Sequence, residues 1–504
     1  MSQPESNRFK TKLRTIFWPI KQSELPKFIP MSALMFCLLF NQNILRILKD
    51  SILISEISAE VTSFTKVYCV TPAAAIFVII YAKLINHITF DRIFYHLIVF
   101  FTGFYIIFAF IIYPNINFFH MNKEKLDSLM LAHQHFKWYI AILGNWSYIV
   151  FYTLSELWPN VFYILLFWQL ANETTSISEA KRFYTLFSLF GNSAVIVVGF
   201  LMLNLSSEDS ISRKLFSFVE SKVLLTQVSI GFVAFSSILS CLLIRYITKK
   251  IITNPDLYPR PPENFSKHKM PLIDSFKYIA RSKYLWLMLV CSASFGLSMN
   301  LVEAVWKAKI KELYPSMIQY ASFSSIYVLW TGVAIMILTV VGNNIMRTRN
   351  WFTAAIISPL IILITGSIFF ILVVFDKAIL TFYEGIILTT PLALSVSVGA
   401  IQNILSKGSK YSIWDTSREM LYIPLDKELR TKGKAAVDVI SPKIGKSASG
   451  LVQSMIFTIL PMATYNSISS SLMIIFILVC LLWIYSIKKI YYEYQKLIES
   501  SLLL

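Results

Sequence analysis

Residues 351–375 read W-F-T-A-A-I-I-S-P-L-I-I-L-I-T-G-S-I-F-F-I-L-V-V-F and carry no charged side chain. A helix needs about 20 consecutive apolar residues to cross the hydrocarbon core of a bilayer. The apolar residues are continuous and do not alternate with polar ones, which favours a helix over a strand of a membrane barrel, because a helix satisfies its own backbone hydrogen bonds in lipid. We therefore expect this stretch to span a membrane.

Similar apolar runs occupy most of the remaining chain. The predicted spans lie near 28–48, 62–85, 93–113, 138–172, 183–204, 223–247, 285–306, 320–343, 351–375, 378–406, 436–465 and 467–487. The fourth and eleventh are overlong, which predicts a kink or tilt at Pro159 and an interfacial start before Gly445. The expected fold class is all-α, a polytopic membrane protein with about 12 transmembrane helices.

The composition agrees with this fold class. The 504 residues are 56% hydrophobic and 15% charged, whereas a soluble domain carries about 25% charged residues. Most of the 46 Lys and Arg fall in alternate segments between spans, which predicts an inner (cytoplasmic) membrane protein with both termini in the cytoplasm. The net charge of +18 reflects this bias and attraction to anionic lipid, so no nucleic-acid partner is expected.

Neither the start of the chain nor its cysteines and histidines predict a special site. Residues 1–27 are polar and basic and precede a run too long for a cleaved signal, so the first helix is expected to stay. The five cysteines are scattered within apolar spans, which excludes a disulfide framework and a metal spacing. An exposed loop explains His133 and His135 better than a metal does. We expect no cofactor, no metal and no obligate protein partner.

A proline-rich, charged connection divides the chain into two halves. The predicted cytoplasmic linker 249–284 contains the sequence K-K-I-I-T-N-P-D-L-Y-P-R-P-P-E-N-F-S-K-H-K. It separates an N-terminal six-helix bundle, 1–248, from a C-terminal one, 285–504.

The two halves also contain similar short sequences at corresponding positions. N-I-L-R at 43–46 and N-L-V-E at 300–303 are separated by nearly the same offset as G-N-S-A at 191–194 and G-K-S-A at 445–448. This spacing predicts a parallel repeat. Two six-helix bundles related in this way are the architecture of major facilitator transporters, which hold the substrate between the bundles at mid-membrane.

Charges inside spans are candidates for function, because a charge near the bilayer centre costs at least about 2.5 to 3.5 kcal/mol. Several polar residues lie within spans or at their ends. Among them are Asn43, Arg46, Lys49 and Asp50 in the first span, Glu156 in the fourth, Asn300, Glu303 and Lys307 in the seventh, and Asn403, Lys407 and Lys410 leaving the tenth. For lysines near span ends the alternative is snorkelling to the headgroups. For the two glutamates the alternative is a structural ion pair between helices.

The triplet Gly445-Lys446-Ser447 resembles the end of the phosphate loop G-x-x-x-x-G-K-[ST]. Position 440 is Ile where that motif needs Gly, and no strand-like run precedes it. A hydrolytic loop is therefore not expected. A G-K-S at a helix start, together with the Arg and Lys above, suits a phosphorylated anion, because helix N-termini and ammonium groups both bind phosphate oxygens.

Eight stretches carry a family resemblance. They are F-W-P-I at 17–20, E-L-P-K-F-I-P-M at 24–31, N-I-L-R-I-L-K-D at 43–50, S-E-L-W at 155–158, E-A-K-R-F-Y at 179–184, N-L-V-E-A-V-W-K at 300–307, I-Q-N-I-L-S-K at 401–407 and R-E-M-L-Y-I-P-L-D-K-E-L-R-T-K-G-K-A-A-V-D-V-I at 418–440. With them the chain resembles the ATP/ADP translocases of obligate intracellular bacteria and plastids.

The resemblance implies import of a nucleoside triphosphate, ATP, in exchange for ADP, without hydrolysis. It also implies that the membrane-embedded charges needed for transport are Lys49, Glu156 and Glu303. A fourth, a lysine near the start of the eleventh helix, corresponds to Lys446, with Lys434 as its rival. Asn300 and Asn403 could meet the base and ribose.

Three departures from the family pattern leave the nucleobase open. Asn41-Gln42-Asn43 stands where N-Y is usual, G-K-S-A-S stands for G-K-S-G-G, and Pro442 lies in a stretch that is often glycine-rich. One alternative is therefore a transporter of another nucleotide, such as GTP and GDP, or a proton-coupled net importer in which Glu156 or Glu303 carries the proton. The other is a membrane-bound nucleotide hydrolase, which would need a metal-binding carboxylate and an intact phosphate loop.

Overall fold

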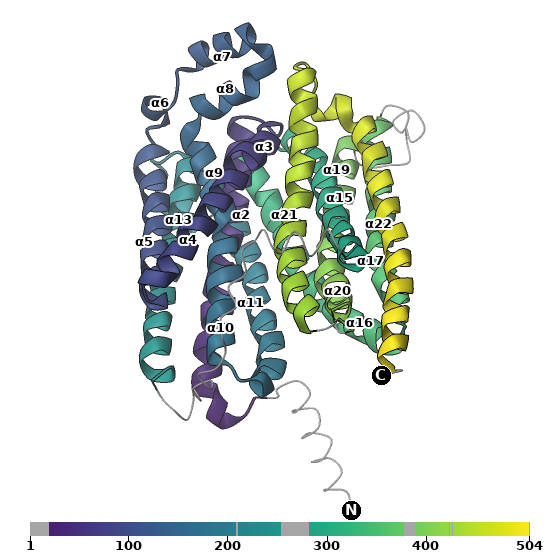
Figure 1. Cartoon of the computed structure of the whole chain (residues 1–504). Coiled ribbons are helices and arrows are strands. Elements are labelled where there is room, and N and C mark those ends of the chain that lie inside the picture. Colours follow the sequence, from purple (N-terminus) through teal and green to yellow (C-terminus); the bar gives the residue numbers. More distant parts are fainter. Residues whose placement is uncertain are drawn as a thin grey trace, which may run out of the picture. The chain divides into compact units, whose positions relative to one another are not determined.

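The computed structural model describes residues 20–207, 210–253, 282–376, 390–422, 424–425 and 427–502. Within these ranges the chain is helical and contains no strand (Figure 1). The long helices are α2 (Leu25–Glu56), α4 (Thr71–His87), α5 (Phe90–Ile107), α9 (Trp146–Trp158), α11 (Ile177–Ser206), α13 (Ser221–Tyr246), α15 (Lys283–Leu313), α16 (Met317–Thr348), α17 (Trp351–Val374), α19 (Pro391–Ser409), α21 (Lys427–Ile459) and α22 (Tyr465–Leu502).

Shorter helical elements connect or extend the long ones. They are η1 (Gln22–Glu24), α3 (Val61–Phe64), η2 (Thr65–Val70), η3 (Phe108–Ile112), α6 (Ile116–Phe119), α7 (Lys123–Ala132), η4 (Gln134–Phe136), α8 (Lys137–Gly144), η5 (Pro159–Phe167), α10 (Trp168–Thr174), α12 (Ile211–Leu215), η6 (Ile247–Ile251), η7 (Lys410–Trp414) and α20 (Asp415–Met420). Ten helical segments of the described chain are long and apolar enough to cross a membrane. The two remaining predicted spans correspond to α19 and α21, which do not meet that criterion, and residues 378–389 of the tenth lie outside the described ranges.

Two predicted features of the fourth span have different outcomes. Its start at 138 is wrong, because α8 ends at Gly144 and α9 begins at Trp146. Asn145 interrupts the helix there and its side chain donates to the carbonyl of Ala141, 2.9 Å away. At Pro159, where the sequence predicts a kink, the α-helix gives way to the π-helical η5.

Contacts within the chain define two compact units. Unit 1 contains residues 1–47, 75–114 and 154–265, and unit 2 contains residues 48–74, 115–153 and 266–504. This partition cuts α2 after Ile47 and α9 after Thr153. The division into bundles 1–248 and 285–504 with the linker 249–284 stays a prediction, and linker residues 254–281 lie outside the described part of the chain.

In unit 1 the first part of α2 is held by polar contacts inside an apolar core. Asn41 donates to the hydroxyl of Ser237 on α13, 3.1 Å away, and Thr102 on α5 donates to the same hydroxyl at 3.0 Å. The indole of Trp158 donates to the Leu38 carbonyl at 3.1 Å. These hydrogen bonds satisfy polar groups that would otherwise be unpaired in an apolar interior.

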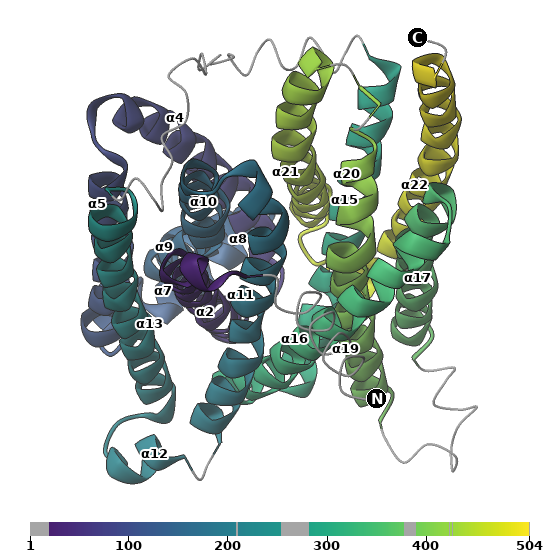
Figure 2. The ribbon, with the colours of Figure 1, turned by 90° about the horizontal axis from the view of Figure 1, so that it is seen from below.

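In unit 2 the central helix is α15, which packs against α19, α21 and α22 (Figure 2). Glycines permit the close packing. A Cβ on Gly445 of α21 would lie 3.1 Å from the Cα of Gly296 on α15, and Gly399 of α19 leaves room for the indole of Trp306. That indole donates to the Val396 carbonyl at 2.8 Å. Small residues let helix backbones approach in this way where apolar surroundings provide little other driving force.

Candidate functional site

Four charged side chains form one cluster where the end of α2 meets α15 in unit 2. Lys49 donates to Oδ1 of Asp50 with Nζ 2.9 Å away, and Nζ of Lys307 lies 2.8 Å from the other carboxylate oxygen, Oδ2. Lys307 also pairs with Oε1 of Glu303 at 3.2 Å, one helical turn earlier. We call Lys49, Asp50, Glu303 and Lys307 the four-charge cluster. It holds two cations and two anions.

The lysines of the four-charge cluster are buried. Their side chains are 5% and 7% exposed, whereas Glu303 is 18% exposed. The amine of Lys49 lies 4.2 Å from the ring centroid of Tyr152, a cation–π contact that is strengthened by the loss of water. Snorkelling would leave the amines at an open surface, and the structure does not support it for these two lysines.

The predicted amide residues are anchored on their own helices. Asn300 donates to the Gly296 carbonyl at 2.7 Å, and Asn403 donates to the Gly399 carbonyl at 2.9 Å. The amide oxygen of Asn300 accepts from Lys66, 3.2 Å away. The oxygen of Asn403 is buried and has no hydrogen-bond partner among the described residues. Both amides are therefore held in fixed orientations, and that of Asn403 keeps an unused acceptor.

Lys407 is supported by aromatic side chains. Its Nζ donates to the hydroxyl of Tyr327 at 2.5 Å and lies 5.0 Å from the centroid of the same ring. Tyr327 packs edge-on against Trp306, with the ring centroids 4.8 Å apart. Lys410 instead pairs with Asp415 at 3.0 Å. The two lysines that leave the tenth predicted span therefore have different partners.

The predicted helix start at Gly445-Lys446-Ser447 is wrong. The triplet lies inside α21, which begins at Lys427 and continues to Ile459. The charged first part of α21 is rich in Lys, Glu, Leu and Ala, which are good helix formers, so the helix begins well before the triplet. No free N–H groups of a helix start are available to bind phosphate at this point.

The three residues of the triplet have different surroundings on α21. Gly445 packs against α15, and the hydroxyl of Ser447 lies 3.2 Å from that of Thr71. Lys446 is exposed and makes no ion pair with the described residues. The side chain of its rival, Lys434, lies outside the described part of the structure.

The remaining predicted site residues belong to unit 1. Arg46 and Glu156 are both half-buried. The backbone carbonyl of Glu156 accepts from the Asn160 side chain at 3.2 Å, beside the π-helical stretch that begins at Pro159. Of the ten predicted residues, the structure thus brings Lys49, Glu303 and Lys307 into one cluster.

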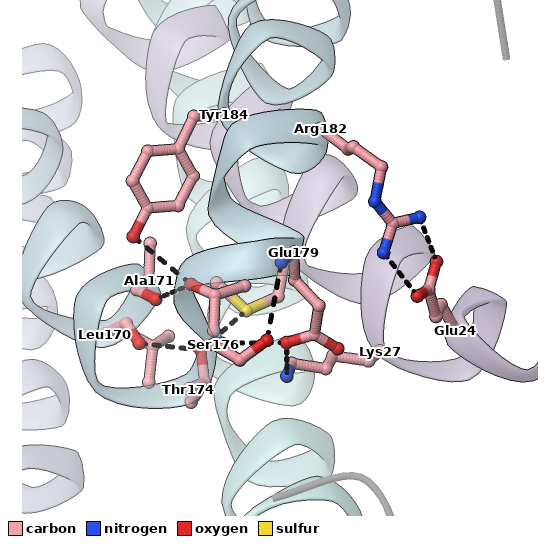
Figure 3. A network of polar contacts seen from close by, with 11 residues as sticks. Glu24, Lys27, Leu170, Ala171, Thr174, Ser176, Glu179, Arg182 and Tyr184 are labelled. Atoms are coloured by element: carbon pink, nitrogen blue, oxygen red, sulfur yellow. Dashed lines mark hydrogen bonds and ion pairs between the residues drawn. The ribbon is translucent and has the colours of Figure 1, made fainter. Parts of the chain in front are cut away.

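A second polar cluster in unit 1 joins two of the quoted stretches, E-L-P-K and E-A-K-R (Figure 3). Arg182 donates to Glu24 through its two terminal guanidinium nitrogens, Nη1 and Nη2, at 2.8 and 2.6 Å, and Lys27 pairs with Glu179 at 2.8 Å. Glu179 also accepts from the backbone N–H of Ser176 at 2.8 Å, as part of a capping box at the start of α11. Glu24 is the last residue of η1 and directly precedes α2. We call Glu24, Lys27, Glu179 and Arg182 the α2–α11 clasp.

Sequence reasoning did not identify several of these partners. Asp50 appears in the sequence as one more charge on the face of the first helix, and nothing shows that it serves two lysines. Lys66 could have been found, because it is a charge inside the predicted span 62–85, whereas Tyr152 carries no signal beyond its position in an apolar run. The clasp does have a signal in the sequence, because E-L-P-K and E-A-K-R each place a Glu three residues before a Lys or Arg. The Glu of each stretch can therefore pair with the cation of the other.

Comparisons with known proteins agree with these observations. The family model described as TLC ATP/ADP transporter matches residues 3–494. The ADP,ATP carrier protein 5 of Rickettsia felis is 64% identical over 498 residues, which cover 99% of this chain and 100% of the relative. The ADP,ATP carrier protein 1 of Rickettsia bellii is 40% identical over 507 residues, with 99% and 100% covered.

A solved transporter shares the fold. The inward-facing structure of a bacterial homologue of the iron transporter ferroportin superposes with a TM-score of 0.59, at 13% identity, over 92% of this chain and 100% of that one. Together with the helices described above, this confirms the predicted all-helical, major-facilitator-like membrane fold.

Proposed function

The chain belongs to the TLC ATP/ADP transporter family, and from this we propose that it imports ATP in exchange for ADP across the membrane without hydrolysing either nucleotide. The observation that carries the proposal is the 64% identity, over nearly the whole length, to a protein named as an ADP,ATP carrier. The four-charge cluster supports it, because buried lysine amines are suitable partners for phosphate oxygens.

Within this proposal the predicted residues take different roles. The phosphates are bound by cationic side chains, which are Lys49, Lys307, Lys407, Arg46 and either Lys446 or Lys434. Glu303 and Glu156 balance the charge of these cations. Asn300 and Asn403 meet the base or ribose, and the unused amide oxygen of Asn403 supports this role, since it can accept from an exocyclic amine or a hydroxyl.

A transporter of another nucleotide is the second candidate. The relatives at 64% and 40% identity are both named as ADP,ATP carriers, so the comparisons do not favour this candidate over ATP and ADP. The phosphate chemistry is the same for adenine and guanine nucleotides, and a change of base requires different contacts to the ring edge only.

Uptake of a panel of labelled nucleotides tests the substrate. Cells that express the chain are supplied with radiolabelled ATP, GTP, CTP or UTP, and each unlabelled nucleotide is used as a competitor. We expect saturable ATP uptake that unlabelled ATP and ADP abolish. Uptake of labelled GTP that adenine nucleotides do not reduce would favour the second candidate, and uptake without any internal diphosphate would favour net import.

We also propose that the chain lies in the inner membrane with both termini in the cytoplasm, on the basis of its Lys and Arg distribution. The exposed helix α7 is expected outside the cytoplasm. A Cys introduced at Ser128 in an otherwise cysteine-free variant should react with an impermeant maleimide in intact cells, and a Cys at Lys488 near the end of α22 should not. The reverse pattern would invert the topology.

A further inference from the structure

Asp50 holds the amines of two different lysines with its two carboxylate oxygens. The distances are 2.9 Å to Lys49 and 2.8 Å to Lys307. Two oxygens of a phosphate group would meet two ammonium groups in the same way, because carboxylate and phosphate oxygens accept charge-assisted hydrogen bonds of similar length. The carboxylate is thus an internal anion at the position where the proposed function requires a phosphate.

Each of the two lysines also has a second partner. Lys307 pairs with Glu303 at 3.2 Å, and the amine of Lys49 faces the ring of Tyr152. A buried ammonium without any partner is strongly unfavourable. The second partners therefore keep both lysines partly compensated if the carboxylate of Asp50 leaves them.

We propose that Asp50 is a positioning residue of the exchange reaction, whose carboxylate holds the amines of Lys49 and Lys307 when no nucleotide is bound and gives them up to phosphate oxygens when one binds. This inference rests on the proposed function, to which it adds an internal carboxylate that competes with the nucleotide for the two lysines. Because the internal carboxylate competes with the substrate, it weakens binding, and for the same reason it promotes release of the nucleotide that has been carried across.

The variant Asp50→Asn removes the negative charge, and its effects on KM and on the maximal exchange rate test the proposal. Without the competing anion, the KM for ATP should fall by about tenfold, the effect of one charge-assisted contact, while the maximal exchange rate falls because product leaves more slowly. The decrease in KM should be larger for ATP than for ADP, since ATP carries more phosphate charge. Asp50→Glu keeps the carboxylate and should have a KM close to that of the wild type.

Asp415→Asn is the matched control. It removes the carboxylate from another lysine–aspartate pair of unit 2, Lys410–Asp415, with a distance of 3.0 Å. The control should leave the KM for ATP unchanged. An Asp50→Asn variant whose KM is unchanged or higher, at equal membrane abundance, overturns the proposal and leaves Asp50 a structural ion-pair partner.

Thermal unfolding of the purified protein with tripolyphosphate gives a measurement that does not depend on transport. Asp50→Asn should be less stable than the wild type without the anion, and tripolyphosphate should raise its Tm more than that of the wild type or Asp415→Asn, because it supplies the missing negative charge. Tripolyphosphate can also be present during purification if the variant is unstable. Equal Tm shifts in all three proteins contradict the proposal.

The two measurements also separate this inference from the proposed function. Tripolyphosphate has no base or ribose. If the wild type exchanges no adenine nucleotide but Asp50→Asn gains the extra stabilisation, the substrate is wrong and the role of Asp50 stands. If the wild type exchanges ATP for ADP and neither the KM nor the Tm responds to Asp50→Asn, the function stands and the role of Asp50 is wrong.

Discussion

Glu303 contacts Lys307 over one helical turn and is more exposed than the lysines of the four-charge cluster, at 18%. The substitution Glu303→Gln keeps its shape and removes its charge. Lys307 retains Asp50, so the protein should still accumulate in the membrane, while exchange should fall at least about tenfold because an embedded charge is lost. Exchange kinetics are compared at equal abundance, and kinetics like those of the wild type would make Glu303 structural.

Lys446 is exposed on α21 and makes no ion pair with the described residues, so its amine is available to a substrate. Lys446→Gln should weaken uptake of ATP and of ADP alike by about tenfold, through loss of one charge-assisted contact. Lys488→Gln, which removes an exposed lysine from α22, is the control and should transport normally. Normal transport by Lys446→Gln as well would make Lys434 the better candidate for the phosphate contact.

At the scale of helices, the packing of α21 on α15 gives the glycine of the G-K-S triplet a structural role. A Cβ on Gly445 would meet backbone atoms of Ala293 and Gly296, which cannot rotate away. Gly445→Ala should therefore lower the Tm of the purified protein by several degrees. Gly231→Ala on α13, where a Cβ meets nothing within 4 Å, should not lower it. Equal stability of both variants would contradict the close packing.

The α2–α11 clasp predicts a pattern of charge reversals. Either Glu24→Arg or Arg182→Glu alone places like charges together and should reduce the amount of folded protein, and the two combined should restore it. The control is the reversed pair Lys283→Glu with Glu493→Lys, whose lysine is 68% exposed, because exposed pairs contribute little. If the combined Glu24 and Arg182 variant is no better than the single ones, the clasp does not hold α2 to α11.

Helices could be predicted from the sequence wherever hydropathy alone determines them. The run 351–375 becomes α17 almost to the residue, because no charged side chain interrupts it. The prediction is poorer where polar residues decide. Asn145 ends a helix inside an apolar run, and the charged stretch from Lys427 continues as helix through the G-K-S triplet. Apolar periodicity gives no information on either.

At the scale of the whole molecule, the fold class could be predicted because the length and spacing of apolar runs almost fix it. The polar contacts could not. The pairing of Asp50 with Lys307 joins residues far apart in the sequence, and so does the grouping of residues 48–74 and 115–153 with residues 266–504. Such contacts depend on three-dimensional packing. Sequence gives the charges but not the pairs that they form.

Counter-exchange in proteoliposomes determines whether the chain exchanges ATP for ADP without hydrolysis. Purified protein is reconstituted into vesicles that contain labelled ADP or no nucleotide, and ATP is added outside. We expect ATP uptake only into ADP-loaded vesicles, release of one ADP for each ATP taken up, and no release of inorganic phosphate. Phosphate release by the purified protein, or equal ATP uptake into empty vesicles, would contradict it.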